Sequence, residues 1–235
     1  RRFFHSDFVA QSLFDIFFVL TRGPLSPDVD WVELDQEVVA VLSNENPISN
    51  NFRETYFEKD LRAPGDDSIY FYRFEGYQIY QLPEANTPSD YSDPDQARLV
   101  MEVDIKNGIN TLYNWEAVAN PNQNVPGEPE AIYVPVVKTE SADEGLKHTF
   151  QLLEDQYATA DRSLINHRDY YFTVLAYGYN NWQTFTQVNQ NPEGQERQYI
   201  GSDDNIQIYT VTPRPIVDVR LNSAYGDGPL VTRLE

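Results

Sequence analysis

Residues 164–177 decide the fold and read Leu-Ile-Asn-His-Arg-Asp-Tyr-Tyr-Phe-Thr-Val-Leu-Ala-Tyr. From Tyr170 onward, alternate positions fall into two different apolar sets, which is the period of a strand whose two faces contact different surroundings. Leu164 lies six residues before Tyr170, on the same parity. In a Greek-key sandwich this spacing is typical of a tyrosine corner, in which the hydroxyl hydrogen-bonds to backbone a few residues upstream. Leu164 and Tyr170 are therefore predicted to form such a corner.

Other segments with strand character lie on both sides of this stretch. They span residues 29–34, 37–42, 69–82, 99–105, 109–115, 131–137, 148–152 and 205–212. Lys106-Asn107-Gly108 predicts a hairpin that pairs 99–105 with 109–115, and Ser92-Asp93-Pro94 predicts the start of a short helix. Residues 178–204 are expected to form a long polar loop. The pattern predicts an all-β chain, an immunoglobulin- or fibronectin type III-like antiparallel β-sandwich with long loop insertions.

The chain divides into three parts. Residues 1–22 carry too many apolar side chains for a free tail, so we expect a short helix or strand that packs on a neighbour. Residues 23–213 form the enlarged sandwich, and residues 214–235 form an exit linker or the start of a following domain. The apolar side chains of the first part include Phe3, Phe4, Phe8, Leu13, Phe14, Phe17 and Phe18. Because the sequence opens with Arg1, we expect a piece of a longer protein.

Composition excludes several classes of function. The formal net charge is -20 and the pI is near 4.3, so the chain lacks the basic stripe that displaces counterions from nucleic acid. The same charge disfavours anionic membrane surfaces, and no apolar window reaches the length of a membrane span. There is no cysteine, which excludes disulfides and thiolate chemistry. The predicted partners are therefore neither nucleic acid nor membrane.

The chain resembles a fibronectin type III domain at three places that follow one another in the expected order. Gly23-Pro24-Leu25-Ser26-Pro27 stands where such domains begin, residues 76–80 resemble the third strand, and residues 164–176 resemble the strand of the tyrosine corner. The tryptophan that is usual near the end of the second strand is replaced by Val41 or Leu42. Asn166 and Arg168 stand where Pro and Thr are common. The resemblance implies a sandwich whose core is packed differently.

A second resemblance concerns the kind of protein. Residues 74–80, 104–108 and 164–167 are similar to segments of large exported proteins of the Bacteroidota, of the type delivered by type IX secretion. Residues 225–229, with Thr232 and Arg233, resemble a recurrent junction in such proteins. The resemblance covers residues 23–235 and implies an extracellular or outer-membrane cell-surface location. It implies no particular activity, because fold alone does not specify function.

No sequence motif points to catalysis. A nucleophile elbow and a phosphate-binding loop are both absent, and the three histidines, His5, His148 and His167, lie on separate segments. We therefore expect a non-enzymatic structural or protein-interaction module whose partners are neighbouring domains or other surface proteins.

Two alternatives remain open. The loop after residue 177 carries aromatic and amide side chains suited to a carbohydrate-binding module, which stacks rings and orients hydroxyls. A calcium-stabilised adhesin is the other alternative, because a hard cation prefers several oxygens on one loop. No further cofactor is predicted. The candidate glycan-binding residues are Tyr177, Tyr179, Asn181, Trp182 and Phe185; the candidate calcium ligands are Asp90, Asp93, Asp95, Asp203 and Asp204.

Overall fold

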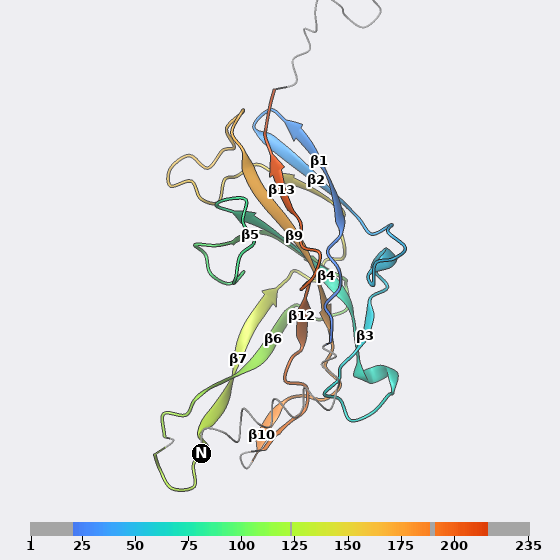
Figure 1. Cartoon of the computed structure of the whole chain (residues 1–235), viewed down its shortest axis with the longest axis vertical. Helices are drawn as coiled ribbons and strands as arrows, with labels where there is room; N and C mark the ends of the chain where they lie inside the picture. Colours follow the sequence, from blue (N-terminus) through green and yellow to red (C-terminus); the bar gives the residue numbers. More distant parts are fainter. Residues whose placement is uncertain (1–20, 123, 189–190, 216–235) are drawn as a thin grey trace, which may run out of the picture.

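The computed structural model describes residues 21–122, 124–188 and 191–215 (Figure 1). The described chain consists mainly of antiparallel strands, with two short 3-10 helices, η1 (Phe52–Glu54) and η2 (Ser68–Tyr70). The expectation of an all-β chain is confirmed. The predicted helix or strand within residues 1–20 and most of the exit segment lie outside the described residues.

The smaller sheet has three strands in the order β1-β2-β8. β1 (Asp28–Leu34) and β2 (Glu37–Ser43) form a hairpin in full register, and β8 (Thr149–Leu152) pairs with the other edge of β2. β2 buries every second side chain because its apolar residues recur with the period of two that places them on one face. This sheet therefore has one apolar face to cover.

The larger sheet is built on β4 (Phe71–Leu82) and β9 (Tyr170–Tyr179), which pair along nearly their whole length. Beyond β4 lie β3 (Phe57–Lys59) and β5 (Arg98–Asp104). Beyond β9 lie β12 (Tyr199–Gly201) and β13 (Ile208–Val211). β9, which contains the alternating residues 170–177, is thus an inner strand with paired strands on both sides.

One hydrophobic core joins the two sheets. Trp31 of β1 stacks on Phe172 of β9 with ring centroids 5.2 Å apart, so the smaller sheet lies against the larger one. Burying side chains of this size stabilises the fold by about 1.5–3 kcal/mol each. The strands contribute Val38, Ala40, Leu42, Phe150 and Leu152 from one sheet and Tyr77, Ile79, Phe172, Val174 and Ala176 from the other.

The opposite face of the larger sheet is buried as well. Tyr80, Leu82 and Leu175 form a second apolar cluster with Ala97 and the partly buried Tyr91, which belong to the connection between β4 and β5. This explains why β4 and β9 are apolar on both parities, a pattern that a strand with one solvated face does not have.

Two further hairpins leave the central sheets. β6 (Thr111–Ala119) pairs with β7 (Ala131–Glu140) and extends from the body as a two-stranded arm (Figure 1). β10 (Thr186–Val188) pairs with β11 (Asn191–Glu193). Residues 178–204 therefore contain three short strands and are not one polar loop, so that prediction was wrong.

The hairpin predicted at Lys106-Asn107-Gly108 was also wrong. β5 pairs with β4, and β6 pairs with β7, so the strands on either side of the turn do not pair with each other. The Asp143 carboxylate accepts hydrogen bonds from the backbone N–H groups of Asn107 and Gly108, at 2.7 and 3.0 Å. A segment distant in the sequence thus holds residues 107 and 108 through the Asp143 carboxylate.

The short helix predicted near Ser92 does not form. Asp90 Oδ1 accepts the Ser92 N–H at 2.8 Å, and Asp93 Oδ1 accepts the Asp95 N–H at 3.0 Å. These side chains bond to backbone two residues on, and such turns compete with helix formation. The chain then enters β5 at Arg98.

The contact expected of a tyrosine corner is present at the start of β9. The Tyr170 hydroxyl accepts a hydrogen bond from the backbone N–H of Ile165 at 2.9 Å. Leu164, beside it, is buried in the shared core. The hydroxyl therefore ties the segment before β9 to the strand itself.

Candidate ligand groove

A groove with a volume of about 420 Å³ lies where β4 begins and β9 ends. We call it the Trp182 groove. Its volume falls within the usual range of about 300–1,000 Å³ for small-molecule sites. It is lined by Ser68, Ile69, Phe71, Arg73, Phe74, Glu75, Ile105, Asn107, Ile109, Tyr179, Asn180, Asn181 and Trp182.

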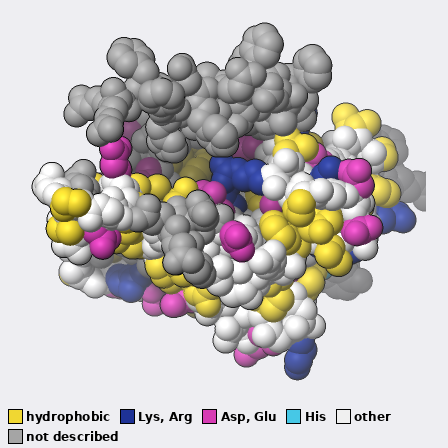
Figure 2. All heavy atoms as spheres, turned by 90° about the horizontal axis from the view of Figure 1, so that it is seen from below, with side chains coloured by type: hydrophobic (Ala, Val, Ile, Leu, Met, Phe, Trp, Pro, Cys, Tyr) yellow, Lys and Arg dark blue, Asp and Glu magenta, His cyan; other side chains and the backbone are white. Residues whose placement is uncertain are grey.

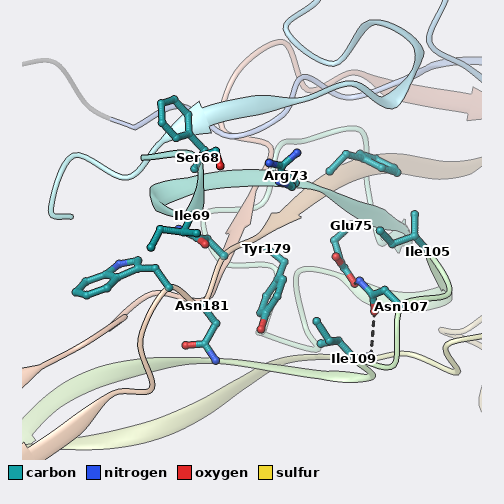
Figure 3. Close-up of a pocket in the computed structure, with 13 residues that line it drawn as sticks. Ser68, Ile69, Arg73, Glu75, Ile105, Asn107, Ile109, Tyr179 and Asn181 are labelled. Atoms are coloured by element: carbon teal, nitrogen blue, oxygen red, sulfur yellow. Dashed lines mark hydrogen bonds between the residues drawn. The ribbon is translucent and has the colours of Figure 1, made fainter. Parts of the chain in front are cut away.

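The two ends of the groove are formed by different segments of the chain (Figure 3). Ile69 and Asn181 lie toward one end, whereas Glu75, Asn107 and Ile109 lie toward the other, and Tyr179 stands between them. The lining thus combines the η2–β4 segment, the turn after β5 and the segment after β9, which are far apart in the sequence.

Aromatic contacts hold the apolar wall. Trp182 packs edge-on against Tyr70 with centroids 5.4 Å apart. Phe71 stacks on Phe57 at 4.3 Å, and the Arg73 guanidinium lies 4.9 Å above the Phe57 ring. Such contacts restrict side-chain motion at modest energetic gain. The aromatic side chains of this wall are therefore packed against their neighbours.

The polar wall centres on Glu75. This residue lies at a register shift in β4, between Phe74 and Gly76, and only 3% of its surface is exposed. Its pKa is raised from 4.5 to about 7. Burial is the main cause, the nearby Asp104 and Asp143 act in the same direction, and a hydrogen bond from Asn107 Nδ2 to Oε1 at 2.8 Å opposes the increase. A carboxyl with such a pKa is present near neutral pH in both the protonated and the ionised form.

Tyr179 joins the two walls. Burial raises its pKa, and Glu75 contributes to the same effect, whereas a hydrogen bond with Asn181 lowers it. Its hydroxyl therefore stays protonated at neutral pH and can act as donor or acceptor.

Three of the five predicted glycan-binding residues line the groove, namely Tyr179, Asn181 and Trp182. Tyr177 and Phe185 do not line it, and both are buried elsewhere in the fold. Tyr177 stacks on Tyr199 of β12 at 5.4 Å, and Phe185 stacks on a tryptophan of β6 at 4.8 Å. These two side chains serve packing, which corrects the expectation that the whole loop is exposed.

Sequence reasoning missed the groove residues that come from other segments, including Ile69, Arg73, Glu75 and Asn107. One signal was available, because Glu75 interrupts a strongly apolar strand next to a glycine, where a β-bulge is common. The turn after β5 gave no such signal in the sequence, because its position beside the groove depends on hydrogen bonds to Asp143.

The candidate calcium ligands do not gather into a site. Asp90 and Asp93 bond to neighbouring backbone and to the side chains of Ser92 and Gln96, and Asp204 Oδ1 accepts the N–H of Asn205 at 2.8 Å. Within the described ranges, no three His, Asp or Glu side chains form a group that could hold a metal ion.

No protein-family model matches the chain, and neither a curated protein nor a solved structure shows significant similarity to it. In the described part of the chain, no helix has the length and apolar character needed to cross a lipid bilayer.

Proposed function

We propose that the chain is a fibronectin type III-like β-sandwich, one non-enzymatic module of a large protein exported to the cell surface of a member of the Bacteroidota. The module serves as a structural or protein-interaction unit between neighbouring domains or surface proteins.

The observation that carries this proposal is the order in which the chain visits the two sheets. β1 and β2 belong to the smaller sheet, β3 to β5 to the larger, β8 again to the smaller, and β9, β12 and β13 to the larger. Crossings of this kind are the Greek-key connections of immunoglobulin-like sandwiches. The hydrogen bond from Ile165 N–H to the Tyr170 hydroxyl supports the same assignment.

The outer surface supports an interaction role. Several large apolar side chains are exposed, among them Phe57 at 46% and Ile69 at 57%. Figure 2 shows one face on which hydrophobic side chains lie in separate patches among polar ones. Scattered exposure of this kind is normal, but an aromatic residue beside a groove is typical of contact surfaces.

The location is tested by labelling intact cells of the source organism with a membrane-impermeant amine reagent. Exposed lysines such as Lys106 and Lys147 are then expected to be labelled in the native protein. Labelling only after cell lysis would contradict surface exposure. A periplasmic protein of the same organism is the negative control.

The module role is tested by deleting residues 1–20. Their many large apolar side chains should dock on this module or on its neighbour, so the deletion is expected to increase dye binding or aggregation relative to the full chain. Unchanged solubility and an unchanged melting temperature would argue against such docking.

A further inference from the structure

We propose that the Trp182 groove binds a neutral saccharide unit, whose ring packs on the aromatic wall and whose hydroxyls hydrogen-bond with Glu75, Asn107 and Asn181. This goes beyond a structural module, because it assigns a ligand class to one surface of the fold.

The aromatic wall suits the apolar face of a sugar ring. Trp182 contributes a large indole that packs against Tyr70 in a T-shaped contact with ring centroids 5.4 Å apart, and Ile69 is 57% exposed. Both line the same groove. A sugar ring that packs here removes apolar surface from water, which favours binding.

The polar wall suits hydroxyl groups. Each sugar hydroxyl both donates and accepts, and so do the amides of Asn107 and Asn181 and a carboxyl near its pKa. Asn107 is fixed in position, since its Nδ2 donates to Glu75 Oε1 at 2.8 Å and its Oδ1 accepts the Ile109 N–H at 2.9 Å (Figure 3). Asn181 is exposed at the other end. The groups are spread along the groove, as recognition of several hydroxyls requires.

Charge favours a neutral ligand. The chain carries a formal charge of -20, which repels polyanionic glycans. The basic side chain in the lining is Arg73, and its guanidinium already lies over the Phe57 ring. A cationic peptide would suit the overall charge, but it does not need a planar aromatic wall opposite amides. The test must therefore distinguish saccharide binding from the binding of a basic peptide.

The test uses the full chain. Wild-type protein is screened on an array of neutral and acidic glycans, and hits are measured by titration calorimetry. The indole N–H resonances of Trp31, Trp115 and Trp182 are followed by NMR, and the neutral ligand is expected to shift the Trp182 resonance. Trp182→Ala should weaken binding by about tenfold or more, since it removes both the stacked ring and the apolar surface that the ring buries.

Matched variants make each result decisive. Trp182→Phe keeps a ring and should lose less affinity than Trp182→Ala, whereas Leu153→Ala removes a 49% exposed apolar side chain away from the groove and should change nothing. If Trp182→Ala fails to fold, Asn181→Ala provides the test. Because Asn181 is exposed, its substitution should lower the affinity for the glycan without lowering the melting temperature. The proposal is overturned by silence of the wild type on all neutral glycans, by preference for acidic glycans or basic peptides, or by unchanged affinity in folded Trp182→Ala or Asn181→Ala. None of these results bears on the sandwich module itself.

Discussion

At the scale of single residues, Glu75 is the most informative side chain. It is buried at a bulge and its pKa is raised to about 7, chiefly by burial. The folded chain therefore binds this proton more tightly than the unfolded chain does. Its contribution to stability is full below pH 4.5, the ordinary pKa, and is lost as the pH rises through about 7.

Glu75→Gln should remove this dependence, because the amide stays neutral. We expect the free energy of unfolding of the variant, relative to wild type, to increase by about 3 kcal/mol between pH 4.5 and pH 8. Urea denaturation across this range measures the difference. Glu84→Gln, at an exposed position, should give a profile parallel to wild type. Parallel profiles for Glu75→Gln would contradict the burial argument.

A substitution at Tyr170 tests the contribution of the tyrosine corner to stability. Tyr170→Phe keeps the buried ring but removes the hydroxyl that accepts the Ile165 N–H. We expect the free energy of unfolding to fall by about 1–2 kcal/mol, the cost of one lost hydrogen bond with a partly buried donor left unpaired. Urea midpoints with an unchanged m-value measure it. Tyr171→Phe, on the opposite face of β9, is the control and should cost less.

At the scale of elements, Gly76 lets β4 approach its neighbours. A Cβ at this position would lie 2.1 Å from the Val103 carbonyl oxygen of β5 and 2.7 Å from the Tyr177 hydroxyl of β9. The Val103 backbone cannot move without breaking the pairing of β5 with β4, and the Tyr177 side chain is fully buried. The absence of a side chain is thus a requirement of the sheet.

Gly76→Ala should therefore destabilise the fold by about 2–3 kcal/mol or more, as overpacking does. The expected sign is a lower urea midpoint with faster hydrogen exchange in β5. Gly65→Ala is a matched comparison, since the atoms nearest to its Cβ belong to the ring of Tyr70, a partly buried side chain, and not to paired backbone. Equal losses at the two glycines would mean that backbone contact is not the cause.

The elements also show where sequence patterns succeed. Strong periodicity predicted β2, β4 and β9 because their side chains are buried through local alternation. The turn at residues 106–108 was misread, because its geometry depends on hydrogen bonds from a segment about 35 residues away. The same holds for the groove, because most of its lining residues lie outside the aromatic segment after residue 177.

At the scale of the whole molecule, the large net negative charge affects the stability of the fold. The chain has 37 acidic and 17 basic residues, so self-repulsion opposes the compact state. Raising sodium chloride from about 10 to 200 mM should raise the melting temperature by screening this repulsion. A melting temperature that falls or stays constant would contradict it.

A comparison of calcium with magnesium distinguishes general charge screening from specific cation binding. Because the described acidic side chains form no metal-holding group, calcium should raise the melting temperature no more than magnesium at equal ionic strength, and chelator should have no effect. Thermal unfolding in the two salts measures this. An increase specific to calcium would support the calcium-stabilised adhesin.

The sequence by itself determined the strand class, the inner strand at residues 170–179 and the acidic character, because alternation and charge are local properties. It also pointed to Tyr179, Asn181 and Trp182. Only the tertiary structure decided that Tyr177 and Phe185 are buried, which strands pair, and that Glu75 and Asn107 lie in one groove with Trp182. Those facts depend on contacts between segments far apart in the chain, which no local pattern encodes.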